Sequence, residues 1–188
     1  MPLTLASASP RRAELLRAAG IEFDVMPADV DESVRAGEAP FNYVRRVAEE
    51  KARVVGARSS DRLILAADTT VVVDDTMLGK PIDDDDAKRM LSLLSGRTHE
   101  VLTAVVIYRT GMSAPLIEAD RTEVEFAPLT EFEIDWYIAT GEPRDKAGAY
   151  AIQGYASRFV TRIDGSYSNV VGLPIALVYQ MLKGVTTR

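Results

Sequence analysis

Hydrophobic periodicity and helix-end signals along the chain predict five helices. Residues 41–59 place Tyr43, Val44, Val47, Ala48 and Val54 at the spacing of an amphipathic helix. Other helices are predicted from residues at their ends, because acidic residues or an N-cap residue lie at the N-terminus and glycine lies at the C-terminus. The predicted helices span Pro10 to about Ala19 and residues 41–59, 83–96, 130–141 and 173–184.

Between these helices lie segments with the pattern of strands. Residues 62–75 are apolar and β-branched on both sides of Asp68, which is typical of a buried strand. Residues 98–110 and 116–129 form two long strand candidates joined by a segment that contains Gly111 and Pro115, as in a hairpin. Shorter strands are predicted at residues 2–6, at 21–26 and at the start of 159–172, and residues 145–157 are predicted to be a loop. Strands interleaved with helices, with one antiparallel pair, indicate the α/β class with a mixed sheet.

The length of the chain allows one substantial core. A chain of 188 residues is short for two independent domains, and no repeat or long linker divides it, so one domain is expected over residues 1–188. Hydrophobic residues make up 47% and charged residues 27%, which is the composition of a globular protein.

Charge and residue counts exclude several classes of function. With 22 basic and 28 acidic residues, the net charge of −6 argues against a nucleic-acid polymer as partner. The chain has no cysteine and one histidine, His99, so thiolate chemistry and a His-rich metal site are excluded and a carboxylate is the expected general base. His99 itself is expected to make a structural hydrogen bond. No apolar run approaches the length of a membrane span and no signal peptide precedes the first strand, so a cytoplasmic location is expected.

The hexapeptide SASPRR, residues 7–12, lies where the first strand ends and the first helix begins. Ser9 suits the N-cap and Pro10 the first helical turn, which places Arg11 and Arg12 at the positive end of the helix dipole. An anion bound there by serine hydroxyls, backbone N–H groups and guanidinium groups would explain this placement. The alternative is that both arginines point into solvent.

Asp68 is the carboxylate least expected from its surroundings, because burial among apolar residues is costly without a compensating partner. It could be a cap or part of a structural ion pair. It could also share a divalent metal ion with the acidic group Asp29, Asp31 and Glu32, since carboxylates and water are ligands of Mg²⁺ and Mn²⁺. The run from Asp83 to Asp86 opens a helix and is interpreted as its solvated first turn.

Three lysines and one glutamine complete the candidates. Lys80, in LGKP, and Lys146, in GEPRDKAG, lie in turns that could fix the direction of a cation, whereas Lys51 lies on a helix and could be an ordinary surface lysine. Neither GxxxxGK[ST] nor GxGxxG occurs, so phosphate binding would depend on side chains and one helix end. Gln153, in AIQG, could pair with the edge of a nucleobase or simply face solvent.

Taken together, these segments resemble one family over nearly the whole chain. SASPRR, DVDE, EEKA, AADTTVV, LGKP, LSGRTH, GEPRDKAGAYAIQG and SYSNVVGLP, in this order, are similar to the Maf family of nucleoside triphosphate pyrophosphatases. The resemblance implies a single α/β domain of the Maf/ITPase-like fold, with a mixed twisted sheet flanked by helices and two lobes around a central cleft. It also implies a homodimer, a nucleoside triphosphate substrate and dependence on a divalent metal ion, Mg²⁺ or Mn²⁺.

KAGAYAIQG resembles the branch of the family that hydrolyses dTTP and UTP. Asp68 matches the proton acceptor, and Glu32 matches a carboxylate on the metal or water side, so both are also the expected metal ligands. The only departure from the family pattern is Asp75, where a glycine is common in the turn. The expected substrate-binding residues are Ser7 and Ser9 beside the helix start; Arg12, Lys51, Lys80 and Lys146 on the phosphate side; and Arg11, Thr69 and Gln153 for substrate choice.

The resemblance implies hydrolysis of dTTP and UTP to the monophosphate and pyrophosphate, with a house-cleaning role, and the arginine pair at the first helix start agrees with a triphosphate substrate. Two alternatives stay open. One is a pyrophosphatase for 7-methyl-GTP or a non-standard purine triphosphate. The other is a nucleotide-binding regulator of cell division that does not turn over its ligand.

Overall fold

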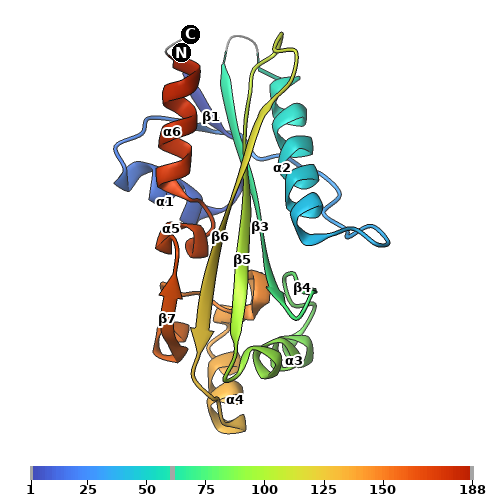
Figure 1. The fold of residues 1–188 in the computed structure, drawn as a ribbon, viewed down its shortest axis with the longest axis vertical. Coiled ribbons are helices and arrows are strands. Elements are labelled where there is room, and N and C mark those ends of the chain that lie inside the picture. Colours follow the sequence, from blue (N-terminus) through green and yellow to red (C-terminus); the bar gives the residue numbers. More distant parts are fainter. Residues whose placement is uncertain (1, 60–61, 187–188) are drawn as a thin grey trace. The chain divides into compact units, whose positions relative to one another are not determined.

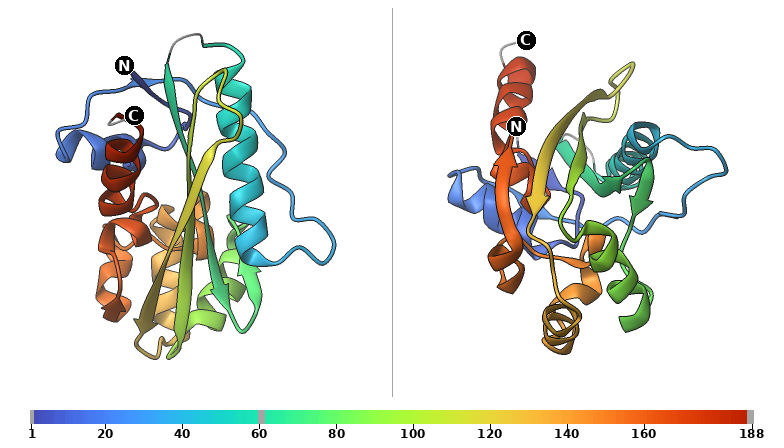
Figure 2. Two further views of the ribbon diagram at one scale, coloured as in Figure 1. Left: turned by 45° about the horizontal axis from the view of Figure 1, so that its top comes forward. Right: turned by 60° about the horizontal axis from the view of Figure 1, so that its bottom comes forward.

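The computed structural model describes residues 2–59 and 62–186, and has the mixed α/β fold that the sequence predicts (Figures 1 and 2). The strands are β1 (Leu3–Leu5), β2 (Asp24–Val25), β3 (Leu63–Val73), β4 (Thr76–Leu78), β5 (Thr98–Tyr108), β6 (Leu116–Phe126) and β7 (Val160–Asp164). The helices are α1 (Pro10–Ala18), α2 (Pro40–Gly56), α3 (Asp84–Leu94), α4 (Glu131–Ala139), α5 (Tyr167–Val171) and α6 (Ile175–Thr186), with 3-10 turns η1 (Glu142–Asp145), η2 (Ala147–Ala149) and η3 (Tyr155–Phe159).

The seven strands form one mixed sheet in the order β2-β1-β3-β5-β6-β7, with β4 paired to β3. β1 runs parallel to both β2 and β3, with Leu5 opposite Leu65, whereas the pairs β3–β4 and β6–β7 are antiparallel. This mixture confirms the predicted sheet type.

The chain divides into two compact units, which are described separately. Unit 1 contains Met1–Thr69, Thr103–Asp120 and Gly172–Arg188, and unit 2 contains Thr70–Leu102 and Arg121–Val171. Three long strands, β3, β5 and β6, contribute residues to both units.

Unit 1 has three layers because alternate residues of its strands face opposite sides of the sheet. On one side, Leu63, Leu65 and Ala67 of β3 pack with α1 and α6 in a buried cluster. On the other side, Ile64 and Ala66 pack against the apolar face of α2 in a second cluster. The segment that leads to Asp68 is therefore fixed from both faces.

Unit 2 is organised around buried aromatic side chains. The rings of His99 and Phe126 meet edge to face with centroids 5.1 Å apart, and Tyr137 meets Phe159 at 5.6 Å. His99 Nε2 lies 2.9 Å from the hydroxyl of Tyr150, which is the structural hydrogen bond expected for this residue. Burial lowers the pKa of His99 to about 4, so the imidazole is neutral at physiological pH.

Helix ends follow the predicted capping chemistry in unit 2. Thr130 and Glu133 form a capping box at the start of α4, and Asp83 accepts a hydrogen bond from the backbone of Asp86 at the start of α3. At the start of α1, Ser9 occupies the N-cap position but its side chain makes no capping hydrogen bond.

The sequence prediction differs from the structure in short elements. β4 and α5 were not predicted, the strand expected over 21–26 is reduced to β2, and the loop expected over 145–157 contains 3-10 turns. Asp74 and Asp75 join β3 to β4 with positive φ angles of 44° and 61°. Asp tolerates this left-handed conformation better than most residues, which accounts for Asp75 at a position where glycine is common.

Candidate active site

The first part of the candidate site is the loop from β1 to α1 in unit 1. Ser7 is buried, and its Oγ accepts hydrogen bonds from the backbone of Ser9 and from Arg12. No acidic residue occupies the first turn of α1, and Arg11 lies there half-buried. The loop therefore combines a hydroxyl, a helix N-terminus and a guanidinium group, as the anion hypothesis requires.

Arg12 is buried, with 8% of its surface exposed, and ties three segments together. Its Nε donates to the carbonyl of Gly172 at 2.8 Å, Nη1 donates to the carbonyl of Ala67 at 2.8 Å, and Nη2 donates to Thr69 Oγ1 at 3.0 Å. With the bond to Ser7, four of its five N–H groups are used within the protein. Arg12 thus links α1, β3 and the segment between α5 and α6, a structural role that the sequence did not suggest.

Thr69 extends this network. Its Oγ1 lies 2.9 Å from Thr103 Oγ1 on β5 and 3.3 Å from the carbonyl of Gly172. Thr103 is buried and was not among the residues singled out from the sequence. The sequence could not indicate that Thr103 lies beside Thr69, because this depends on β5 pairing with β3 in the sheet.

The second part of the site is an ion-pair chain of Lys51, Asp68 and Glu32, also in unit 1. Lys51 Nζ lies 2.8 Å from Asp68 Oδ1 and 2.6 Å from Glu32 Oε1. Asp68 and Lys51 are 5% and 7% exposed, whereas Glu32 is exposed. The structure therefore brings together the acid on β3, the lysine on α2 and the acidic loop, and Lys51 is not a solvated surface lysine.

Burial controls the protonation of Asp68. Desolvation raises its pKa above the ordinary carboxyl value, Lys51 and Arg12 oppose this rise, and Glu32 adds to it. Asp68 Oδ2 is buried and has no hydrogen-bond partner among the described residues. One carboxylate oxygen is thus fixed by Lys51 while the other is left to accept a proton or a ligand.

Residues of α2 hold the acidic loop at Glu32. Tyr43 donates from its hydroxyl to the carbonyl of Glu32 at 3.0 Å, and Arg46 donates to the carbonyl of Ser33 at 2.9 Å. Arg46 also forms a two-pronged ion pair with Glu38, which holds the pKa of Glu38 at about 2. Sequence reasoning missed the roles of Tyr43, Arg46 and Glu38, because their partners lie 8 to 13 residues away, beyond the spacing of one helical turn.

The remaining predicted binding residues belong to unit 2. Lys80 is exposed, Lys146 forms an ion pair with Asp145, and Gln153 is exposed. The turns of Lys80 and Lys146 are joined, because Gly148 donates its backbone N–H to the carbonyl of Gly79 at 3.0 Å. Gly148 has a positive φ of 69°, and a Cβ there would lie 2.9 Å from Val71, so the close approach requires glycine.

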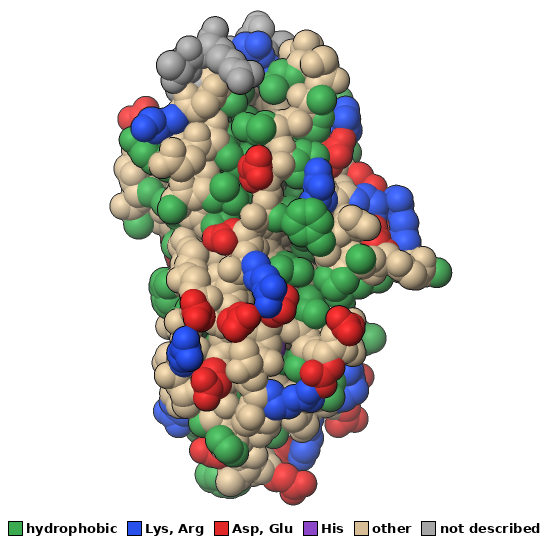
Figure 3. Space-filling model, viewed as in Figure 1, with side chains coloured by type: hydrophobic (Ala, Val, Ile, Leu, Met, Phe, Trp, Pro, Cys, Tyr) green, Lys and Arg blue, Asp and Glu red, His purple; other side chains and the backbone are tan. Residues whose placement is uncertain are grey.

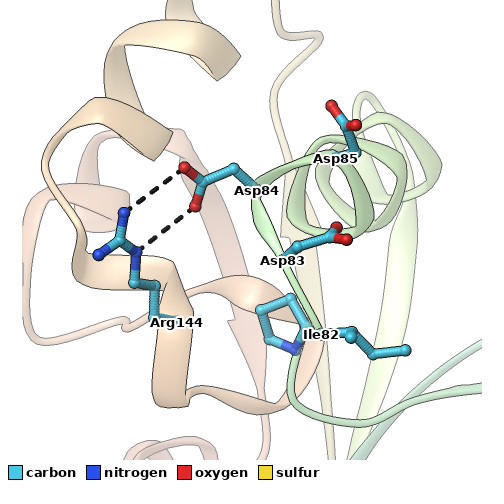
Figure 4. A pocket seen from close by; sticks show the side chains of 6 residues that line it. Ile82, Asp83, Asp84, Asp85 and Arg144 are labelled. Atoms are coloured by element: carbon cyan, nitrogen blue, oxygen red, sulfur yellow. Dashed lines mark hydrogen bonds and ion pairs between the residues drawn. The ribbon is translucent and has the colours of Figure 1, made fainter.

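A surface hollow of about 510 Å³ lies beside the start of α3 in unit 2. Figure 4 shows Asp83, Asp84 and Asp85 among the residues that line it, with Arg144 paired to the carboxylate of Asp84. Three carboxylates against one paired arginine would repel a triphosphate. This hollow is therefore unsuited to the anion that the chain is expected to bind.

A divalent metal ion can be tested against the carboxylates of unit 1. Among residues 2–59 and 62–186, no group of three or more His, Asp or Glu side chains is arranged to hold a metal ion. Mg²⁺ is nevertheless often held by one or two carboxylates together with substrate phosphates and water. Asp68, with its unpartnered Oδ2, and Glu32 fit that arrangement as hard oxygen ligands.

With this geometry established, comparison with known proteins decides the family. A family model described as Maf-like protein matches residues 2–185. The chain belongs to the Maf-like protein family. This assignment confirms the resemblance drawn from SASPRR and the seven segments that follow it.

Relatives with assigned activities are similar over nearly their whole length. The chain is 56% identical over 184 residues to the dTTP/UTP pyrophosphatase of Anaeromyxobacter dehalogenans strain 2CP-1, covering 96% of this chain and 92% of the relative. It is 52% identical over 181 residues to the dTTP/UTP pyrophosphatase of Citrifermentans bemidjiense (96% and 94% covered) and 52% identical over 183 residues to that of Koribacter versatilis (97% and 94% covered).

Among solved structures, the Ham1 protein of Staphylococcus aureus has a similar fold. The TM-score is 0.53 at 13% identity, and the match covers 98% of this chain and 99% of that chain. This match confirms the predicted ITPase-like fold class.

The surface gives two further observations. On the face shown in Figure 3, Lys and Arg side chains are interspersed with Asp and Glu rather than gathered in one basic area. No helix in the described part of the chain has the length and apolar content needed to cross a bilayer.

Proposed function

We propose that this Maf-like chain hydrolyses dTTP and UTP to the nucleoside monophosphate and pyrophosphate. The observation that carries the proposal is the buried carboxylate Asp68, fixed by Lys51 beside the loop of Ser7 and Arg11, which would bind the phosphates. It is supported by identities of 50–56% to relatives named dTTP/UTP pyrophosphatase.

In this proposal Asp68 is the general base. A water molecule attacks the α-phosphorus, its proton passes to the unpartnered Oδ2 of Asp68, and the bond from the α-phosphorus to the bridging oxygen breaks. The electron pair of that bond leaves with pyrophosphate. A raised pKa makes Asp68 a stronger base than an exposed aspartate, and such a base contributes about 10²–10⁴-fold to a rate.

Lys51 holds this carboxylate in its working state, and Glu32 would join it as a metal ligand. Lys51 keeps Asp68 ionised and fixes Oδ1, which leaves Oδ2 as the acceptor. Asp68 and Glu32 would also hold Mg²⁺ or Mn²⁺, which would supply positive charge to the substrate phosphates when bound.

The remaining predicted residues keep their roles as parts of the proposal. Arg11, Lys80 and Lys146 would contact phosphate or choose substrate, and Ser9 would contribute its backbone and hydroxyl. Gln153 would pair with the O4 and N3 edge that uracil and thymine share. A homodimeric assembly and a cytoplasmic location are likewise proposed from the sequence.

A substrate panel tests the proposal. Pyrophosphate release is measured for dTTP, UTP, dCTP, GTP, 7-methyl-GTP and ITP, each with Mg²⁺, with Mn²⁺ and with a chelator. We expect dTTP and UTP to be the best substrates and the chelator to stop turnover. Preference for 7-methyl-GTP or ITP would replace the pyrimidine assignment by the purine alternative, and nucleotide binding without pyrophosphate release would favour a regulator.

A further inference from the structure

The carboxylate of Glu142, the first residue of η1 in unit 2, binds the backbone on the C-terminal side of Gln153. Its Oε2 accepts from the N–H of Tyr155 at 3.0 Å, and its Oε1 accepts from the N–H of Ala156 at 3.4 Å. Hydrogen bonds to a charged acceptor are stronger than those between neutral groups. Glu142 thus fixes the start of η3.

Tyr137 on α4 binds the backbone on the other side of Gln153. Its hydroxyl donates to Glu142 Oε1 at 2.7 Å and accepts from the N–H of Ala151 at 3.1 Å. The ring is fully buried, so the hydroxyl has little freedom to move. Burial, together with the bond to Glu142, raises the pKa of Tyr137, which keeps the hydroxyl protonated.

The peptide between these anchors is a tight turn with Gln153 near its tip. Gly154 donates its N–H to the carbonyl of Ala151 at 3.0 Å, and Gln153 itself is exposed. A Cβ at Gly154 would lie only 2.0 Å from Glu142 Oε2, so glycine is required for the carboxylate to reach the backbone. Glu142, Tyr137 and Gly154 together fix the backbone on both sides of the exposed side chain of Gln153.

We infer that Tyr137 and Glu142 are a positioning pair that aims Gln153, and that they thereby determine which base the protein accepts. The inference rests on the proposed function, in which Gln153 reads the base. Neither side chain needs to contact the substrate. Loss of the pair would let the turn move and weaken discrimination by the amide, while the acid and lysine of unit 1 would be unchanged.

The test measures kcat/KM for dTTP and dCTP, whose bases differ at the edge formed by N3 and position 4 and also in the 5-methyl group of thymine. Glu142→Gln places an amide N–H against a backbone N–H, and Tyr137→Phe removes the acceptor for Ala151. For each variant we expect the ratio of dTTP to dCTP to fall about 5- to 30-fold, chiefly through KM for dTTP, since paired contacts to a base edge give discrimination of this order. Glu131→Gln, at an exposed residue in the first turn of α4, is the matched control and should leave the ratio unchanged.

A second arm asks whether the pair acts through Gln153. In a Gln153→Ala background, Glu142→Gln should cause no further fall in the ratio. An unchanged ratio in both single variants, or a full additional fall in the Gln153→Ala background, would overturn the inference.

A third arm needs no substrate. Amide hydrogen exchange at Ala151, Tyr155 and Ala156 should be faster in Glu142→Gln than in the wild type, and unchanged protection would overturn the inference. If the wild-type protein releases no pyrophosphate from dTTP or UTP, the proposed function itself fails. If instead the wild type is active and the variants keep its ratio of dTTP to dCTP, the proposed function stands and only the positioning role of Tyr137 and Glu142 fails.

Discussion

Replacing Lys51 by methionine should destabilise the protein in a manner that depends on pH. Methionine keeps most of the volume of the lysine stem but removes the ammonium group that lies between Asp68 and Glu32. Glu32 is exposed and can be hydrated instead, so the cost falls on Asp68, which is 5% exposed. An ionised Asp68 would then be buried without its nearest compensating charge.

The magnitude follows from this burial. Removing one partner of a buried ion pair costs about 3–5 kcal/mol, and we expect about 3 kcal/mol because Arg12 still stabilises the negative charge of Asp68. For a chain of this length, each kcal/mol lowers Tm by about 2–4 °C, which gives a fall of about 6–12 °C at neutral pH.

The sign of the pH dependence can be worked out from Asp68. Desolvation already places its folded-state pKa above the unfolded value, and loss of Lys51 raises it further. A carboxyl group with a raised pKa favours the folded state at low pH, and this contribution is lost as pH rises through the folded-state pKa. The deficit of Lys51→Met relative to the wild type should therefore be small at pH values below the ordinary carboxyl pKa and should grow as pH rises above it.

Denaturant unfolding followed by circular dichroism at several pH values measures this deficit. Lys51→Met combined with Asp68→Asn should recover most of the lost stability at neutral pH, because no unpaired charge is then buried. Lys88→Met, which removes an exposed ion pair with Asp135, is the control and should change Tm little. A Lys51→Met protein as stable as the wild type, or a deficit that is the same at every pH, would refute the reasoning.

The remaining predictions concern the base, the arginine and the histidine. Asp68→Asn should abolish pyrophosphate release from dTTP while keeping the circular dichroism spectrum, and turnover at the wild-type rate would exclude Asp68 as the base. The acid limb of the kcat/KM profile, which reports the free enzyme, should have a midpoint above the ordinary carboxyl range, because burial raises the pKa of Asp68 and only its ionised form accepts a proton; a midpoint at or below about 4 would contradict this. Arg12→Met should lower the unfolding free energy by about 2–4 kcal/mol, since the carbonyls of Ala67 and Gly172 lose their donor, and an unchanged denaturation midpoint would argue against this linking role. The imidazole of His99, the only histidine, should titrate by NMR with a midpoint near 4, and a midpoint near 6.5 would contradict its burial.

The larger elements were predictable because their physical causes are local. The apolar face of α2, the capping box of Thr130 and Glu133, and the continuous apolar run of β3 each follow from nearby residues. β4 and α5 were missed because three- and five-residue elements carry too little periodicity. They depend on pairing and packing with distant segments instead.

The candidate site divides in the same way. That Asp68 needed a compensating partner followed from a carboxylate inside an apolar strand, but the identity of that partner could not be read from the sequence. Lys51 looked like a surface lysine because its neighbours Glu49 and Glu50 are acidic, and only the packing of α2 against the sheet turns its side chain toward Asp68.

Arg12 shows why a basic motif predicts charge better than role. SASPRR supplies two guanidinium groups at one helix start, and the fold separates them: Arg12 is buried against backbone carbonyls, whereas Arg11 is half-buried in the first turn. Contacts to main-chain carbonyls cannot be read from a sequence pattern. The number of arginines at a helix start is therefore only an upper limit on the number available to bind a phosphate.

Tyr137 and Glu142 show that residues outside any recognisable motif can also matter for a site. One is a tyrosine on a helix and the other a glutamate in a turn, and both bind the backbone around Gln153.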